Sequence, residues 1–428
     1  MTSGDIELVG GPGAVAPLPE VAEFQGLYGT YHVSELLLQK IWLRGGFDAK
    51  RARTTHGEPV VVLHPGSWNR LSGPDFRGAR LRIADREVTG DIEVHFHAAA
   101  WAQHGHDRDR AYDGVVLHVV LFPSSQTTPP TRTSDGREIP VLVLVDLLWH
   151  DLEEYATDEA VAALSSRDAL PLVEDLLALE PAARAAAIHA AAQTRWQEKV
   201  RYAKLRIDRC GWEEACHLTA LEILGYRANR EAMLRVGTRF PASRWRSPEH
   251  PTGPETEALL AAGGESWTLR GVRPANQPRL RLEQYRRWMA RVPDWPARLV
   301  EFCLPTLDDA APEGTSITMW RRRVGLTRLR EQLARELAGE QLGGVRLDTW
   351  IVNLVLPFYA AAHAQLPEGV RVAAAWWRLW TPGDIAEVLL EAARRLAPPG
   401  SREPRSNEAI QGLLGIHLRR ISAAGTPG

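Results

Sequence analysis

Lysine and cysteine are scarce in this sequence. The 428 residues contain 51 lysines and arginines, but only four of these are lysines, namely Lys40, Lys50, Lys199 and Lys204. Arginine therefore carries most of the positive charge. The three cysteines, Cys210, Cys216 and Cys303, are too few for a disulfide framework and are typical of a protein in a reducing compartment. Cys210 and Cys216-His217 offer at most three zinc ligands, and their spacing matches none of the common ligand pairs, so reduced buried thiols are the favoured interpretation.

Long apolar runs and a large net charge are also absent. No apolar segment is long enough to cross a bilayer, and residues 1–20 lack the basic and apolar parts of a secretory signal. The formal net charge of -2 excludes a basic field over the whole chain, so a nucleic-acid-binding surface would have to be local. We expect a soluble cytoplasmic protein with no membrane partner.

The hydrophobic content of 44% and the length of 428 residues predict a globular chain of two or three domains. Residues 1–27 are rich in glycine and proline and are expected to form a flexible tail. Residues 28–150 have a mixed pattern of helix and strand. Residues 151–428 show helical periodicity throughout, with a candidate division into two subdomains at the Gly/Pro-rich segment 237–256. The fold class expected is therefore α+β, an α/β core followed by a large all-α region.

The order of elements in the mixed region carries information. A helix is expected after Ser34, a typical N-cap, and it should end at Gly45. A second short helix is expected over residues 98–104, between the third and fourth strands. The strands are expected at residues 59–64, 76–83, 88–97, 115–122 and 139–145.

Two acidic residues lie on the expected hairpin. Asp75 begins one strand and Glu93 lies near the end of the next, so a tight turn near residues 84–86 should bring them together. Paired carboxylates of this kind are ligands for a hard divalent cation, Mg²⁺ or Mn²⁺. His95 follows on the same face as Glu93, and this face is expected to point away from the core.

Strict alternation places Asp75 on the wrong face. Because Ala79, Leu81 and Ile83 must face the core, alternation would turn Asp75 inward as well. One extra residue at Arg77-Gly78 would restore Phe76 to the core and place Asp75 beside Glu93. The sequence therefore predicts a β-bulge at this point.

These residues resemble the core of the PD-(D/E)xK, or restriction-endonuclease-like, nucleases: Pro74-Asp75, a hairpin, Glu93-x-His95, then a helix and a strand. The resemblance implies that Asp75 and Glu93 bind Mg²⁺ or Mn²⁺, which activates water for attack on a phosphodiester. It also implies a supporting ligand on the first helix, for which Glu35 is the candidate. The family's lysine is replaced by His95, and no lysine occurs between Lys50 and Lys199.

A longer pattern is similar to an uncharacterised bacterial family, domain of unknown function 2851. It comprises HPG (64–66), GPDF (73–76), DIEVH (91–95), W-x-x-H-x-H (101–106), AYD-x-V-x-LHVV (111–120) and RPAN-x-P (273–278). This resemblance implies no activity. The functional expectation therefore rests on the nuclease-like core.

Several other residues are candidates for supporting roles. His104 and His106 lie in a polar loop where phosphate contacts are expected, although such a loop is also typical of a solvated connector. Arg80 and Arg82 alternate on the strand opposite its apolar set and could contact nucleic acid. His118, like His64, interrupts an apolar run and is expected to be a hydrogen-bonded core histidine.

The favoured function is metal-dependent hydrolysis of phosphodiester bonds in DNA or RNA, with Asp75, Glu93 and His95 as the catalytic residues. One alternative is a degenerate nuclease fold that has lost catalysis with its lysine and acts as a nucleic-acid-binding or assembly module. A third is a metal-dependent hydrolase of small molecules that uses the histidines.

Overall fold

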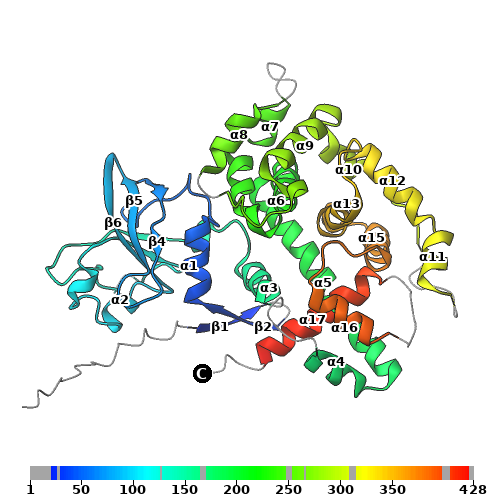
Figure 1. Cartoon of the computed structure of the whole chain (residues 1–428), viewed down its shortest axis with the longest axis horizontal. Coiled ribbons are helices and arrows are strands. Elements are labelled where there is room, and N and C mark those ends of the chain that lie inside the picture. Colours follow the sequence, from blue (N-terminus) through cyan, green and yellow to red (C-terminus); the bar gives the residue numbers. More distant parts are fainter. Residues whose placement is uncertain are drawn as a thin grey trace, which may run out of the picture. The chain divides into compact units, whose positions relative to one another are not determined.

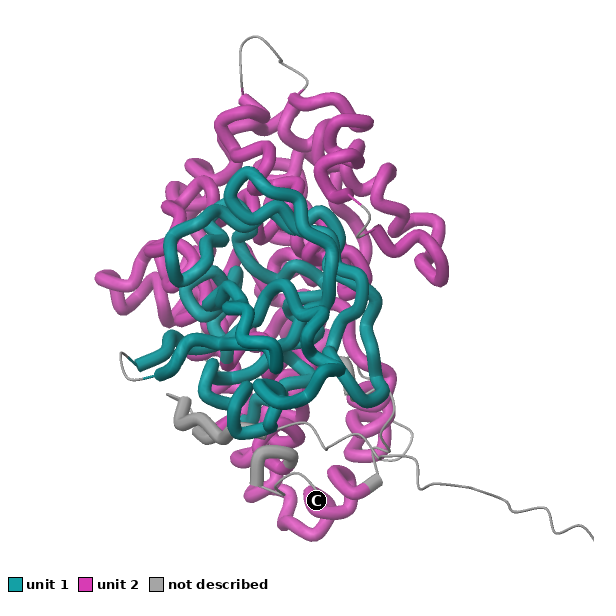
Figure 2. The backbone as a smooth tube through the Cα atoms, turned by 90° about the vertical axis from the view of Figure 1, so that its left-hand side faces the viewer, with its two compact units in different colours: residues 1–24, 32–152 teal, residues 25–31, 153–428 magenta. Residues whose placement is uncertain are grey.

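The computed structural model describes residues 21–26, 29–125, 128–163, 170–246, 253–264, 267–307, 315–397 and 405–423. These residues divide into two compact units, coloured separately in Figure 2. The first consists mostly of residues 32–152 and contains the main sheet, and the second consists mostly of residues 153–428 and is helical. The chain is therefore an α+β protein, as expected.

The sheet of the first unit is mixed. Its strand order is β3-β5-β6-β7-β8, with the short β4 paired to β5. The pairs β3–β5 and β5–β6 are antiparallel, whereas β6–β7 and β7–β8 are parallel. The strands are β3 (Val60–His64), β4 (Ser67–Trp68), β5 (Phe76–Ile83), β6 (Arg86–His95), β7 (Val115–Val120) and β8 (Val141–Val143).

Helix α1 (Glu35–Arg44) begins and ends where its caps predict, and it packs against β6 (Figure 1). The Ser34 side chain accepts a hydrogen bond from the backbone N–H of Leu37, and Gly45 ends the helix at φ 66°. The short helix α2 (Ala100–Gln103) follows β6, and the 3₁₀ helix η1 (Arg110–Tyr112) precedes β7.

Part of the expected tail is a strand. Residues Val21–Gly26 form β1, which pairs with β2 (Gly29–Ser34) in a separate two-stranded sheet. The glycines and prolines that suggested a tail lie mainly before Val21, and residues 1–20 and 27 are outside the described residues. The sequence interpretation of Val21–Gly26 was therefore wrong.

The bulge predicted in the β5–β6 hairpin is present. Phe76 pairs with Ile92 and Ala79 with Gly90, so β5 has one residue more than β6 across this interval. Gly78 has a φ of 65°, a conformation that glycine adopts without strain. The hairpin turns through Ala84 and Asp85, because Ile83 pairs with Arg86. Phe76 and Ala79 consequently both face the core, and each is fully buried.

The second unit is built on one large hydrophobic cluster. The cluster joins buried side chains from Ala192 to Trp380, on both sides of segment 237–256, of which residues 247–252 lie outside the described part of the chain. Most of its tryptophans are fully buried, as expected for core residues. A smaller cluster joins α4, α16 and α17. The α-helices of this unit are α3 (Leu152–Ala163), α4 (Leu170–Leu177), α5 (Pro181–Cys210), α6 (Trp212–Arg239), α7 (Ala242–Trp245), α8 (Thr256–Gly263), α9 (Pro278–Arg291), α10 (Trp295–Glu301), α11 (Ile317–Arg323), α12 (Leu326–Glu336), α13 (Gly344–Trp350), α14 (Leu356–Ala362), α15 (Pro367–Leu379), α16 (Glu387–Arg395) and α17 (Asn407–Ala423).

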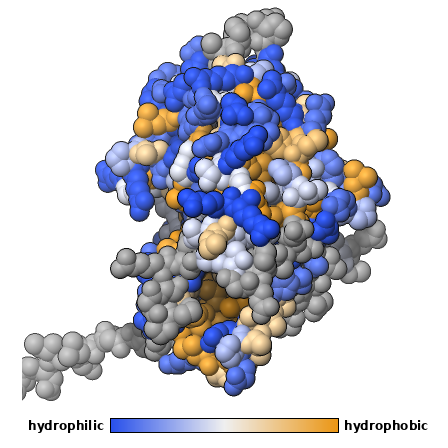
Figure 3. All heavy atoms as spheres, turned by 90° about the vertical axis from the view of Figure 1, so that its right-hand side faces the viewer, coloured by the Kyte–Doolittle hydropathy of each residue, from blue (hydrophilic) through white to orange (hydrophobic). Residues whose placement is uncertain are grey.

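The helices of the described residues were compared with what a membrane-spanning helix requires. Within the described residues, no helix combines the length and the apolar composition needed to cross a bilayer. Figure 3 shows hydrophilic residues over much of one face, with separate apolar patches between them. Scattered apolar side chains of this kind are normal on a protein surface.

The tight contact of β6 with β7 can be tested at Gly90. A Cβ atom at Gly90 would lie 2.3 Å from Val116 Cγ1 and 2.6 Å from the carbonyl oxygen of Gly114. We therefore expect Gly90→Ala to lower the free energy of unfolding by roughly 1–3 kcal/mol in urea denaturation. Gly78→Asn is the matched control, because nothing lies within 4 Å of a Cβ there and asparagine tolerates a positive φ. Equal stability of the two variants would contradict the packing described.

Candidate active site

The two carboxylates of the hairpin meet at one edge of the sheet. Asp75 directly precedes β5, and Glu93 lies on β6. The backbone N–H of Asp75 donates to Glu93 Oε2 at 2.9 Å, and the backbone N–H of Val94 donates to Asp75 Oδ2 at 3.0 Å. These crossed hydrogen bonds depend on the bulge, which places Asp75 opposite Glu93.

Helix α1 orients Asp75 through a side chain that sequence reasoning missed. Gln39 Nε2 donates to Asp75 Oδ1 at 2.6 Å, while Gln39 Oε1 accepts from Trp68 Nε1 at 3.0 Å. Because the indole N–H can only donate, it fixes the amide oxygen of Gln39 toward Trp68 and the amide nitrogen toward Asp75. A glutamine four residues into a helix gives no sequence signal of such a role.

Glu35, the expected supporting ligand, is the first residue of α1 and is buried. Its negative charge contributes to raising the pKa of Glu93. The structure therefore places Glu35 near the pair formed by Asp75 and Glu93, so that three carboxylates influence one region.

Four histidines form a cluster beside the second carboxylate, and two of them lie against Glu93 itself. His95 Nδ1 lies 2.9 Å from His118 Nε2, and His95 Nε2 lies 3.1 Å from His104 Nδ1. Glu93 Oε1 is 3.6 Å from His95 Nε2 and 3.4 Å from His106 Nε2. On the far side of the cluster, His118 Nδ1 is 3.1 Å from the hydroxyl of Thr131. The chain Thr131–His118–His95 therefore fixes the orientation of the His95 ring.

Three of these imidazoles are arranged so that they could hold a metal ion. One ring nitrogen from each of His95, His104 and His106 lies within 4.8 Å of the other two, and the described residues contain no other such group. Glu93 Oε1 could add an oxygen ligand to these nitrogens. The hydrogen bond of His118 to His95 has the form of an outer-shell contact that orients a ligating histidine.

The site is buried, which corrects the expectation that Glu93 and His95 point into solvent. Glu93 is 6% exposed and His95 only 2% exposed. The segment from α2 to η1 covers this face: Trp101 packs on His106 and His118, and the Tyr112 ring stacks on His106 with their centres 3.7 Å apart. Alternation along a strand identifies a face but does not reveal that a later loop covers it.

Burial perturbs the protonation of both carboxylates and of the imidazoles of His95 and His118. Desolvation is the main cause that raises the pKa of Asp75, with the neighbouring Glu93 second, and it raises the pKa of Glu93 to about 8. It also lowers the pKa of His95 well below its usual value and lowers the pKa of His118 to about 3. The imidazoles of His95 and His118 are therefore neutral at pH 7, the form that binds metals and accepts protons.

The remaining candidates lie in different surroundings. Arg80 and Arg82 are exposed on β5, and Arg82 forms an ion pair with Glu87 at 2.6 Å, whereas Arg80 has no such partner among the described residues. His118 is fully buried and hydrogen-bonded, as expected of a core histidine. His64 accepts from the backbone N–H of Gly66 through Nδ1 but is only half-buried, because β3 has an exposed face, so its expected place in the core was wrong. The three cysteines are all free thiols.

Comparison with known proteins gives one match. A family model described as a protein of unknown function (DUF2851) matches residues 35–264, which include every residue of this site. No curated protein and no solved structure matches the chain.

The raised pKa of Glu93 predicts a pH dependence of stability. Between pH 6.5 and 8, folded Glu93 retains a proton that the unfolded chain has released, because its pKa is about 8 when folded and about 4.5 otherwise. Stability should therefore fall as the pH rises through this window, by up to about 1.4 kcal/mol per pH unit. Urea denaturation in the presence of EDTA measures this slope. Glu93→Gln should flatten it, whereas Glu58→Gln, at an exposed glutamate, should not. Identical slopes in all three proteins would contradict the burial of an uncompensated carboxylate.

Proposed function

The chain belongs to this family of unknown function (DUF2851), so its activity has to be argued from the site, and we propose that it is a metal-dependent nuclease hydrolysing phosphodiester bonds in DNA or RNA. The observation that carries the proposal is the buried contact of Asp75 with Glu93. Among the described residues, no lysine or arginine pairs with either carboxylate. A buried and a half-buried carboxylate without a cationic side chain are suited to a divalent cation as their counter-charge.

The order of elements supports the same proposal. Helix α1, strand β3, the β5–β6 hairpin, helix α2 and the parallel strand β7 follow one another in the order that suggested a PD-(D/E)xK core. Asp75 and Glu93 occupy the positions that this resemblance assigns to metal ligands.

The donors present fit a divalent cation and favour Mn²⁺ over Mg²⁺. Asp75 and Glu93 offer the oxygens that both ions accept, and the nitrogens of His104 and His106, which leave His95 free as a base, suit a transition metal better than Mg²⁺. When bound, such a cation would supply an activated water and neutralise charge on the phosphate. Gln39 and the N–H of Val94 hold Asp75 in place for this role.

His95 is the residue we propose to accept a proton, in place of the lysine of the resembled family. Burial and the neighbouring His118 keep it neutral, and the hydrogen bond to His118 fixes which ring edge faces Glu93. A neutral imidazole can act as a base, whereas a protonated lysine can only supply charge.

Substrate contact and location complete the proposal. Arg80 is exposed on the strand that follows Asp75 and is unpaired among the described residues, so it is the better candidate of the two arginines for a phosphate contact. Arg82 would first have to break its ion pair with Glu87.

The three free thiols support a place in the reducing cytoplasm.

The first test is cleavage of DNA and RNA with Mn²⁺ or Mg²⁺. We expect wild type to be active, and Asp75→Asn and Glu93→Gln each to lose activity by about a hundredfold or more, because each removes a ligand charge. Asp85→Asn, at the exposed hairpin turn, should retain full activity. Failure of wild type with every substrate and metal, together with metal-independent binding of nucleic acid, would favour the non-catalytic binding module instead.

The second test concerns His95 and pH. A base must be neutral to act, so wild-type activity should fall on acidification, and the lowered pKa of His95 places that fall below pH 6.5. His95→Ala should lose activity by roughly a hundredfold and lose this acid limb, while Mn²⁺ still raises its melting temperature through Asp75 and Glu93. An unchanged pH–rate profile in His95→Ala would remove His95 from the mechanism.

A further inference from the structure

The helical unit contains a pocket that the nuclease proposal does not use. It has a volume of about 630 Å³ and is lined from α3, α5, α6, the 3₁₀ helix η5 (Pro274–Asn276), α13 and the segments around α16 and α17. This volume lies in the range of sites for drug-sized or nucleotide-sized molecules. All lining residues belong to the helical unit.

A break in α6 shapes one wall of the pocket. Tyr226 has φ 54° and ψ -171°, and Asn229 is also non-helical. Asn229 stabilises the break by hydrogen bonds to both the N–H and the carbonyl of Thr268, at 2.7 and 3.0 Å. Strained backbone of this kind is concentrated at functional sites. The residue after Tyr226 is Arg227, which lines the pocket.

The lining is positively charged. Seven cationic side chains and four carboxylates line the pocket, which leaves a surplus of three positive charges. The four carboxylates are all paired, with Arg206, Arg230 or Arg346. The cation Arg195 is paired with Glu198, outside the lining. With Glu198 counted, the surplus is two, and three lining cations have no carboxylate partner: Lys199, Arg227 and Arg273.

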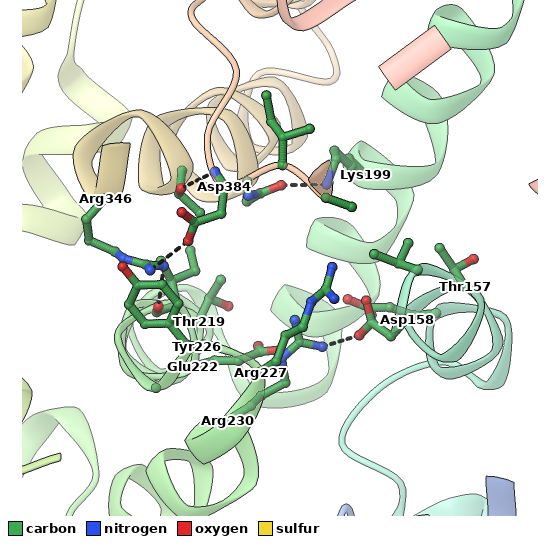
Figure 4. A pocket seen from close by; sticks show the side chains of 18 of the residues that line it. Thr157, Asp158, Lys199, Thr219, Glu222, Tyr226, Arg227, Arg230, Arg346 and Asp384 are labelled. Atoms are coloured by element: carbon green, nitrogen blue, oxygen red, sulfur yellow. Dashed lines mark hydrogen bonds and ion pairs between the residues drawn. The ribbon is translucent and has the colours of Figure 1, made fainter. Parts of the chain in front are cut away.

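These three cations lack anionic partners. Arg227 and Arg273 are exposed and make no ion pair with any described residue. Lys199 Nζ donates to Asn353 Oδ1, a neutral acceptor, at 2.6 Å. Burial, with a contribution from Arg195, lowers the pKa of Lys199 to about 8, although nearby acids oppose the shift. Figure 4 shows Lys199 and Arg227 on opposite sides of the same open space, with Arg230 turned to Asp158.

Two side chains that line the pocket, Arg195 and Gln411, carry a buried polar atom without a hydrogen-bond partner among the described residues. Arg195 is 6% exposed, and its Nε has no hydrogen-bond partner among the described residues. Gln411 Oε1 is likewise buried without a partner there. A buried polar atom that makes no hydrogen bond costs stability, so this wall of the pocket is not optimised for stability alone.

We propose that this pocket binds a phosphorylated small molecule of nucleotide size that carries two or three negative charges. Arginine's planar group matches phosphate oxygens bidentately, and the three cations without a carboxylate partner match a di- or triphosphate. The positive groups converge on a pocket, whereas a nucleic-acid strand needs cations spread along a groove. Arg273 and Asn276, from the sequence motif RPAN, both line this pocket, which gives that motif a role.

The test is calorimetric titration of the full chain with AMP, ADP, ATP and pyrophosphate in EDTA, so that the metal site cannot contribute. We expect affinity to rise with the charge of the phosphate group. The double variant Arg227→Ala/Arg273→Ala should weaken binding by at least about tenfold, because two charge-assisted contacts are lost. Arg328→Ala removes an arginine that is also exposed and unpaired among the described residues but lies outside the pocket, and it should bind as wild type does.

Three results would overturn the proposal: no binding of any of the four probes, equal weakening by Arg328→Ala, or much tighter binding of a 5′-phosphorylated oligonucleotide than of every mononucleotide. The last result would indicate a pocket for a strand end. Asp75→Asn should bind the probes normally. Loss of nuclease activity and loss of this binding are therefore separate outcomes.

Discussion

The structure of the first unit depends on holding two carboxylates together away from water. Asp75 and Glu93 repel each other when both are ionised, and burial strengthens that repulsion. The bulge at Gly78 gives the pair its register, and the amides of Gln39 and Val94 satisfy Asp75. Neutral imidazoles occupy the space where a lysine would otherwise have offset the charge. Such an arrangement is costly without a cation, which is why we regard it as functional rather than structural.

Local sequence patterns predicted much of the structure of this unit. Features that depend on contacts between distant parts of the chain could not be predicted in this way. Ser34 and Gly45 predicted the ends of α1, and the alternation of side chains that would have turned Asp75 inward predicted the bulge. Each of these signals lies within a few residues of the feature that it predicts. The burial of the site could not be predicted, since it depends on Trp101 and Tyr112 folding back over β6. The pocket of the helical unit was also missed, because its lining is drawn from residues between Glu154 and Leu414.

The two units use charge in different ways. The sheet unit gathers acids and neutral histidines, whereas the pocket of the helical unit gathers cations. The near absence of lysine is consistent with both. The proposed site has His95 where the resembled family has a lysine, and the cations of the pocket are nearly all arginine, which remains charged whatever its surroundings. A chain of nearly neutral overall charge can thus contain two sites of opposite character.

The mixed pairing of β6 has a consequence for how the chain folds. Its antiparallel partner β5 is joined to it by a two-residue turn, so the hairpin that carries Asp75 and Glu93 can form by local contacts, on a timescale of microseconds. Its parallel partner β7 can pair only after the intervening segment with α2 has closed, and Thr131 lies further along still. We therefore expect the acidic pair to assemble early and the histidine layer to close over it late, so that the proposed site is open to solvent until the covering loop is in place.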